Sequence, residues 1–148
     1  MFNKGLKCNK DIGTGDTGVA KGMSNIFLVT ASSTTVIDTL PTKDWNVRAV
    51  TTMASMFEGA VAFDQDLNSW DVAAVTTMAS MFKGASVFGT NNGDITGWST
   101  GAVEDMSNMF NKAVKFNKDI GAWHTGAAKD MSSMFHGAAE FNQVIDTL

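Results

Sequence analysis

Cysteine is almost absent from this chain of 148 residues, because Cys8 is the only one. A single cysteine excludes an internal disulfide framework. A catalytic thiol needs a nearby base, and both histidines, His124 and His136, lie more than a hundred residues further along the sequence. Cys8 falls at a core position of the repeat described below. We therefore interpret it as a small buried apolar side chain.

Other features that would indicate particular functions are also missing. Lys and Arg number 11 against 15 Asp and Glu, giving a net charge of −4. Nucleic-acid binding needs clustered basic side chains, so the sequence predicts no nucleic-acid partner. No apolar run approaches the roughly 18 residues that predict a transmembrane segment, and residues 1–10 lack the apolar core of a signal peptide. Without a nucleophile elbow, phosphate loop or dinucleotide fingerprint, we predict a protein that is not an enzyme and binds no cofactor.

What the sequence does contain is a repeated phrase. It begins with a tryptophan and continues with Met-x-x-Met-Phe, a small residue, a Phe, and an Ile or Leu. The four tryptophans that begin copies are Trp45, Trp70, Trp98 and Trp123, spaced 25, 28 and 25 residues apart. A fixed period of this size is typical of stacked repeat architectures, in which each unit buries its apolar face against its neighbours. We call the stretch from the first Met to the small residue the Met-Phe phrase.

The repeat extends through the whole chain. Met1 to Lys4 aligns with Met109 to Lys112, and Val36 to Leu40 recurs letter for letter as Val144 to Leu148. We therefore predict a single domain, 1–148, with degenerate repeats in 1–44 and regular repeats in 45–148. Two stretches exceed the period, Pro41 to Asp44 and Gly89 to Gly93, and these are expected to leave the stack as surface loops.

Two periodicities alternate within each copy. Met53, Met56, Phe57 and Ala60 fall at i, i+3, i+4 and i+7, which predicts one face of a short helix. The segments that follow, such as 63–67 and 116–120, are interpreted as short strands. The predicted fold class is therefore an α/β repeat solenoid of about six turns of about 25 residues, each with a short helix and a short parallel strand.

The repeated sequence resembles a known family, the BspA-like surface-protein repeats, also called the bacterial surface protein 26-residue repeat. The matching stretches are Trp70-Asp71-Val72, Val75 to Met78, Met81-Phe82, Gly84-Ala85 and Phe116 to Ile120. The chain departs from the pattern at Cys8, Gly15, Thr30 and Ser33. The resemblance implies a right-handed, leucine-rich-repeat-like solenoid with a parallel strand ladder and no catalytic motif. It also implies a surface or secreted location and a role in adhesion.

Most residues able to carry chemistry have a plainer interpretation. The Met and Phe columns are predicted to be core rather than a soft-metal or ligand site, with Phe82, Met81 and Met106 nearly fully buried. Buried tryptophans are expected to donate to carbonyls of the adjacent turn. His124 occupies a slot that other copies fill with polar residues, which marks it as a surface position rather than a zinc ligand.

One column of carboxylates has two possible interpretations. Aspartates recur just before the Ile or Leu of each copy, at Asp11, Asp66, Asp94 and Asp119. Stacked turns place equivalent residues about 4.8 Å apart, so Asp66, Asp94 and Asp119 could form a Ca²⁺-binding ladder. The alternative, which we favour, is that each Asp caps backbone N–H groups of its own turn, because one carboxylate per turn is few for Ca²⁺.

Two functional hypotheses follow. The first is a non-enzymatic structural or protein–protein interaction module, and the second is an adhesion module that binds glycan or protein with the help of Ca²⁺. The interaction face is predicted to comprise Asp64, Gln65, Asn117, Lys118, Asn142 and Gln143. The last copy keeps its full apolar phrase, so Phe141, Ile145 and Leu148 are predicted to form an end contact. A protein partner or neighbouring repeats would cover them.

Overall fold

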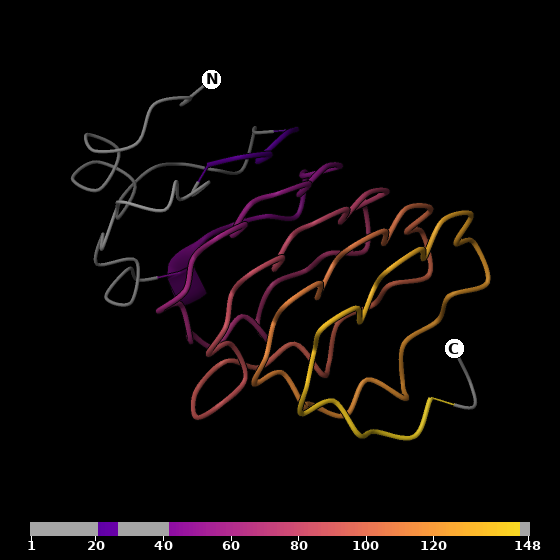
Figure 1. Ribbon diagram of the computed structural model, residues 1–148. Coiled ribbons are helices and arrows are strands. Elements are labelled where there is room, and N and C mark those ends of the chain that lie inside the picture. The colour runs from indigo at the N-terminus through magenta and orange to yellow at the C-terminus, as the bar shows by residue number, and fades with distance from the viewer. Residues whose placement is uncertain (1–20, 27–41, 146–148) are drawn as a thin grey trace.

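The computed structural model describes residues 21–26 and 42–145 of the chain. In Figure 1 the chain winds through successive coils that lie side by side, and its colour advances steadily from one end of the stack to the other. We use the word coil for one such circuit. Parallel bridges join equivalent residues of neighbouring coils, pairing Gly22 with Thr52, Thr52 with Thr77, Thr77 with Asp105, and Asp105 with Asp130. The repeat period therefore corresponds to one circuit of the backbone.

The predicted α/β class is wrong. The only helix within the described ranges is the 3₁₀ helix η4 (Thr42–Asp44), and the parallel pairs are isolated bridges rather than strands of a sheet. The expected helix at 53–60 and the expected strands at 63–67 and 116–120 are turns and irregular backbone. A leucine-rich-repeat-like coil of helix and strand is therefore not the architecture of this protein. Its coils are built almost entirely from tight turns.

Positive φ angles explain why the Met-Phe phrase does not form a helix. In the phrase 78–85, Ser80 has φ 57° and Gly84 has φ 74°, and equivalent residues of the other phrases share this conformation. The N–H of Met81 donates to the carbonyl of Met78 (3.0 Å), and that of Ala85 to the carbonyl of Phe82 (3.0 Å). A positive φ at the third residue of such a turn is the type II geometry. Two successive four-residue turns produce the same i, i+3, i+4, i+7 spacing as a helix.

The turns leave alternate N–H groups free to bond with the next coil. In the phrase 78–85 the donors are Met78, Ser80, Phe82 and Gly84, and their acceptors are the carbonyls of Asp105, Ser107, Met109 and Asn111, at 2.8–2.9 Å. The phrases at 53–60 and 106–113 bond in the same register. The ladder has one polarity in these phrases, because N–H groups point towards the C-terminal end of the stack and carbonyls point back. A helix would have used these groups internally.

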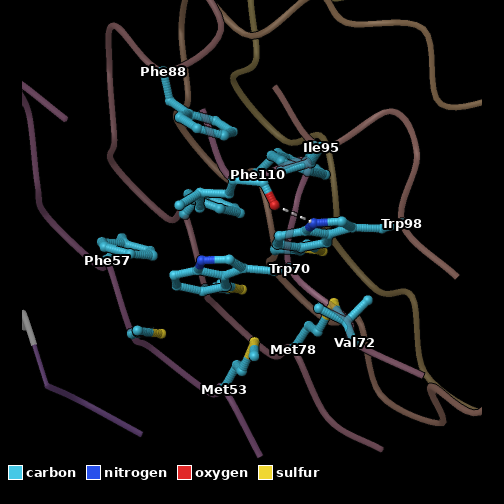
Figure 2. Close-up of a cluster of buried hydrophobic side chains, with 14 of the residues drawn as sticks. Met53, Phe57, Trp70, Val72, Met78, Phe88, Ile95, Trp98 and Phe110 are labelled. Carbon is cyan, nitrogen blue, oxygen red and sulfur yellow. Dashed lines mark hydrogen bonds between the residues drawn. The ribbon is translucent and has the colours of Figure 1, made fainter. Parts of the chain in front are cut away.

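The core lies inside the coils and is continuous along the stack. Phe82, Met81 and Met106 are each 0% exposed, so the prediction of their burial is confirmed. Figure 2 shows aromatic rings of neighbouring coils lying over one another. The rings of Phe82 and Phe110 are 5.8 Å apart between centroids, and their planes are nearly parallel, at 1°. In these columns each aromatic ring lies over the equivalent ring of the next coil, so the aromatic layer of the core repeats from coil to coil.

The tryptophans form a second column with its own hydrogen bonds. Trp70 and Trp98 stack at 6.4 Å, and Trp98 and Trp123 at 6.3 Å. The indole N–H of Trp98 donates to the carbonyl of Leu67 (2.8 Å), drawn as the dashed line in Figure 2. Trp70 donates to the carbonyl of Thr42 in η4 (2.7 Å), and Trp123 to that of Ile95 (3.3 Å). The prediction that these N–H groups reach the preceding coil is confirmed for these three residues.

The two insertions differ in how they leave the stack. Thr42 of η4 is only 2% exposed and accepts the indole N–H of Trp70, so the predicted loop Pro41 to Asp44 is anchored to the core at Thr42. Lys43 and Asp44 are exposed, as expected for a surface loop. In the second insertion Asn91 and Asn92 are exposed, whereas Gly93 is buried. The second loop leaves the stack only at its tip. Predictions made for Cys8, Asp11 and Leu148 fall outside the described residues.

A serine-to-glycine change tests the turn geometry. Ser80 has a left-handed φ of 57°, a conformation that is unfavourable for any residue with a Cβ atom. The Ser80 hydroxyl forms no hydrogen bond with the described residues. Ser80→Gly is expected to raise the free energy of unfolding by about 0.5–1 kcal/mol, measured by urea denaturation. Ser99→Gly, where φ is not positive, is the control and should lower it. Destabilisation by Ser80→Gly would contradict the two-turn geometry.

Candidate interaction surfaces

Asp64 was predicted to point outward on the interaction face, and this is wrong, because Asp64 is only 7% exposed. Its Oδ1 accepts the N–H groups of Gly89 (2.8 Å) and Gly93 (3.0 Å). Its Oδ2 accepts those of Asn91 (2.9 Å) and Asn92 (3.2 Å). The inserted loop of the next coil turns its backbone N–H groups inward and needs an acceptor. The carboxylate of Asp64 satisfies four of them.

This loop borders a depression of the described surface. The hollow has a volume of about 330 Å³ and is lined by Ala62, Asp64, Val87, Thr90, Asn91, Asn92 and Lys115. It is shallow, and the carboxylate inside it is already engaged by the loop. The hollow therefore offers little to a small molecule beyond the exposed asparagine side chains and Lys115.

Three of the other predicted face residues do meet. The side-chain carbonyl of Asn117 accepts the backbone N–H of Asn142 (2.9 Å) and the side-chain amide of Gln143 (2.9 Å). Gln143 also donates to the backbone carbonyl of Asn117 (3.1 Å). Asn117 and Asn142 are exposed, while Gln65 and Lys118 are half-buried. The predicted face is thus a joined amide cluster on the last two coils, separated by the 89–93 loop from the Asp64 position.

The aspartate column caps its own turns. In each case one carboxylate oxygen accepts the backbone N–H two residues further along the chain. The donors are Asn68 for Asp66 (2.8 Å), Thr96 for Asp94 (3.0 Å) and Gly121 for Asp119 (2.9 Å). This local bonding is the capping interpretation, which is confirmed for these three residues. Within the described ranges, no group of three or more His, Cys, Asp or Glu side chains gathers as a metal site would.

Calcium is therefore expected to have little effect on this protein. The free energy of unfolding gains RT ln(1 + [L]/Kd) from a ligand that binds only the folded chain, and a site with one carboxylate per coil binds weakly. Thermal midpoints measured with excess CaCl₂ and with EDTA should agree within about 1 °C. A midpoint that rises with CaCl₂ and falls back when Asp94 is replaced by Asn would instead support the Ca²⁺ ladder.

Sequence reasoning missed a second polar column at the bridged positions. One carboxylate oxygen of Asp105 accepts the N–H of Ser107 (2.9 Å), and that of Asp130 accepts the N–H of Ser132 (2.8 Å). Hydrogen bonds from the Ser132 backbone and hydroxyl lower the pKa of Asp130 from 3.8. These hydrogen bonds therefore stabilise the folded chain at neutral pH, and their contribution is lost as the pH falls through the lowered pKa of Asp130. The sequence feature that could have predicted this column is the Thr or Asp that recurs two residues before a small residue in the regular copies.

Oppositely charged side chains link the coils at the surface. Lys83 pairs with Glu58 (3.0 Å), Lys129 with Glu104 (2.7 Å) and Lys115 with Glu140. Each pair joins adjacent coils, but the side chains are substantially exposed, so each contributes little free energy. His124 and His136 are exposed, in agreement with the surface position expected for His124.

The last described coil has a row of backbone N–H groups without acceptors among the described residues, and we call this side of the coil the open edge. In the phrase 131–138 the N–H groups of Met131, Ser133, Phe135 and Gly137 occupy the donor positions of the ladder. Within residues 21–26 and 42–145 they donate to no acceptor. The carbonyls of the first three accept from Met134, His136 and Ala138 in their own coil. This edge therefore offers donors without matching acceptors.

The last described coil also carries partly exposed apolar side chains. Phe141 is half-buried, and Ile145 is 37% exposed. Phe135 stacks on Phe110 at 5.7 Å, and Phe141 stacks on Phe116 at 5.9 Å. Their other neighbours in these two columns would lie beyond the last described coil. Of the predicted end contact, Phe141 stacks on Phe135 of the phrase 131–138 at 4.1 Å, and Ile145 is an exposed side chain of the same last described coil.

Within the described ranges the only helix has three residues, so none is long enough to cross a lipid bilayer. Compared with known families, the sequence matches one model over two overlapping stretches, 1–92 and 31–148. That family is described as Mycoplasma protein of unknown function, DUF285. The chain belongs to this family. No curated protein and no solved structure matches it.

This match corrects the resemblance inferred from the sequence. The family found is DUF285 and not the BspA-like surface repeat. The leucine-rich-repeat-like fold expected from that resemblance is also absent from the described coils. The expectation of a surface or secreted location rested on the same resemblance and falls with it.

Proposed function

We propose that this member of the DUF285 family is a non-enzymatic interaction scaffold that binds another protein through the C-terminal edge of its stack. The observation that carries the proposal is the row of N–H donors at Met131, Ser133, Phe135 and Gly137. The same last described coil carries Phe141, whose ring stacks on that of Phe135, and the exposed Ile145. Unpaired backbone donors next to apolar surface are a template for pairing with another chain. Such a contact gains both hydrogen bonds and apolar burial.

The interior supports a scaffold rather than a catalyst. The buried side chains of the described coils are almost all Met, Phe, Trp, Val, Leu, Ile and Ala. The buried carboxylate of Asp64 is committed to the loop that it holds. Adhesion assisted by Ca²⁺ is not carried forward, because the carboxylates of Asp66, Asp94 and Asp119 already cap their own turns.

The test compares retention of proteins by the immobilised chain and by two variants. Ile145→Asp places a charge at an exposed position of the last described coil, and Val61→Asp places the same charge at an exposed position of an earlier coil. A bound protein should be retained by the wild-type chain and by Val61→Asp, but lost from Ile145→Asp. Equal retention by all three proteins would contradict binding at this edge. Turnover of a substrate by the purified chain would contradict the non-enzymatic assignment.

A further inference from the structure

The open edge restricts what can bind it, because it is not an ordinary strand edge. A strand edge presents N–H and C=O groups in alternation, and a partner strand pairs with both. The edge at 131–138 presents N–H groups at alternate residues, while the neighbouring carbonyls are used within the coil. Its complement is a row of carbonyls at the same spacing. Within the described chain, such rows occur on the N-terminal side of the Met-Phe phrases, for example at Thr77, Ala79, Met81 and Lys83.

The sequence identifies which phrase fits. Residues 109–148 correspond to residues 1–40 at a constant offset, as in Met1 to Lys4 with Met109 to Lys112 and Val36 to Leu40 with Val144 to Leu148. By this offset, Lys129, Met131 and Ser132 repeat Lys21, Met23 and Ser24 as identical residues. The last described coil therefore repeats side chains of the segment 21–26, and the structure shows which coil that segment packs against.

That partner is the coil that begins at Thr51. The N–H of Met23 donates to the carbonyl of Thr52 (2.9 Å), and the N–H of Thr51 donates to the carbonyl of Lys21 (2.8 Å). The hydroxyls of Ser24 and Thr52 are 2.9 Å apart. A parallel bridge joins Gly22 to Thr52. Identical residues at 129, 131 and 132 can make the same contacts with the same coil.

From this equivalence we propose that the C-terminal edge of one chain binds the coil at 51–59 of a second copy, in place of that copy's residues 21–26. The proposal rests on the interaction function above and names its partner. Exchange of equivalent segments between identical chains is a known route to self-association, and a head-to-tail contact of this kind can propagate. The carbonyls of Thr52 and Ala54 would then accept the N–H groups of Met131 and Ser133.

Apolar burial favours the exchange. The C-terminal segment has Phe141 where the N-terminal segment has Ser33, and Met134 where it has Ile26. Phe63 and Phe57 begin the described part of the columns that contain Phe141 and Phe135. Docking would therefore place Phe141 against Phe63, in the arrangement that Phe116 and Phe141 already have at 5.9 Å. An aromatic pair of this kind adds stabilisation beyond the apolar area that it buries.

Disulfide trapping between two different variants tests the contact itself. Ser132→Cys and Thr52→Cys are prepared as separate full-length proteins, each with Cys8→Ser, and mixed under mild oxidation. Their side chains should meet as those of Ser24 and Thr52 do, so a mixed disulfide dimer is expected. The control mixes Ser107→Cys with Thr52→Cys, because position 107 repeats position 132 but already lies beside the next coil. A dimer yield no higher than the control would overturn the proposal.

The second test measures self-association by sedimentation, with the wild-type chain and two single-residue variants. Wild-type protein should associate increasingly with concentration, and Ser132→Lys should abolish the association. Ser99→Lys, the same change at an exposed site away from the edge, should leave it intact. A wild-type monomer at every concentration overturns self-docking. If the monomeric chain still retains a different protein and Ile145→Asp abolishes that retention, the interaction function stands without self-docking. If the chain neither associates with itself nor retains another protein, the interaction function is contradicted as well.

Discussion

Replacing Phe82 with alanine is expected to lower the free energy of unfolding by about 3–5 kcal/mol. Phe82 is 0% exposed and stacks on Phe57 at 5.5 Å, on Phe110 at 5.8 Å and on Phe88 at 4.1 Å. Removing the ring would leave a cavity bounded by three other rings. The neighbouring coils cannot close it, because their spacing is fixed by the backbone ladder on both sides. Urea denaturation followed by tryptophan fluorescence measures the change.

Phe135→Ala is the matched control for this prediction. Phe135 occupies the same position of its phrase but is only half-buried, and it has a described ring of its own column on one side alone, that of Phe110. Its replacement should cost clearly less than that of Phe82. An unchanged denaturation midpoint for Phe82→Ala, or equal losses at the two positions, would contradict a core organised as stacked rings.

Asp64→Ala is expected to lower the free energy of unfolding by about 2–4 kcal/mol, because a buried carboxylate that accepts four backbone N–H groups is removed. The cost falls mainly on Gly93, whose N–H is buried and would lose its acceptor. The N–H groups of Asn91 and Asn92 lie at the exposed tip and can turn to water. The loop should therefore exchange its amide hydrogens faster, as hydrogen-exchange mass spectrometry of 89–93 would measure.

Asp64→Asn separates charge from shape. Asparagine keeps one side-chain oxygen acceptor but puts an NH₂ group where the second oxygen accepts two N–H groups, so an intermediate loss is expected. A second comparison comes from Gly93→Ala, since a Cβ there would lie 2.6 Å from Oδ1 of Asp64 and 2.7 Å from the nitrogen of Gly89. That variant should disturb the same loop while the carboxylate remains. Wild-type stability and exchange in Asp64→Ala would show that the loop does not depend on the carboxylate.

Some of the candidate surface could be predicted from the sequence. Phe141 and Ile145 were identified because the last copy keeps its apolar phrase, and in the structure Phe141 stacks on Phe135 while Ile145 is exposed on the same coil. The donors at Met131 and Ser133 could not be found in this way, since backbone hydrogen bonding depends on conformation and every non-proline residue has an N–H group. Asp64 was misplaced for a related reason. Its sequence position is like that of Asn117, and only the inserted loop of the neighbouring coil makes it an internal acceptor.

The sequence by itself determined the repeat, its register and the residues of the core. Apolar spacing fixes which side chains face inward, and Phe82, Met81 and Met106 are buried as that spacing requires. Only the tertiary structure decided how the backbone satisfies its hydrogen bonds. The spacing of Met78, Met81, Phe82 and Ala85 fits a helix and a pair of type II turns equally well. The turns occur because the carbonyls of the next coil accept the N–H groups that a helix would have used itself.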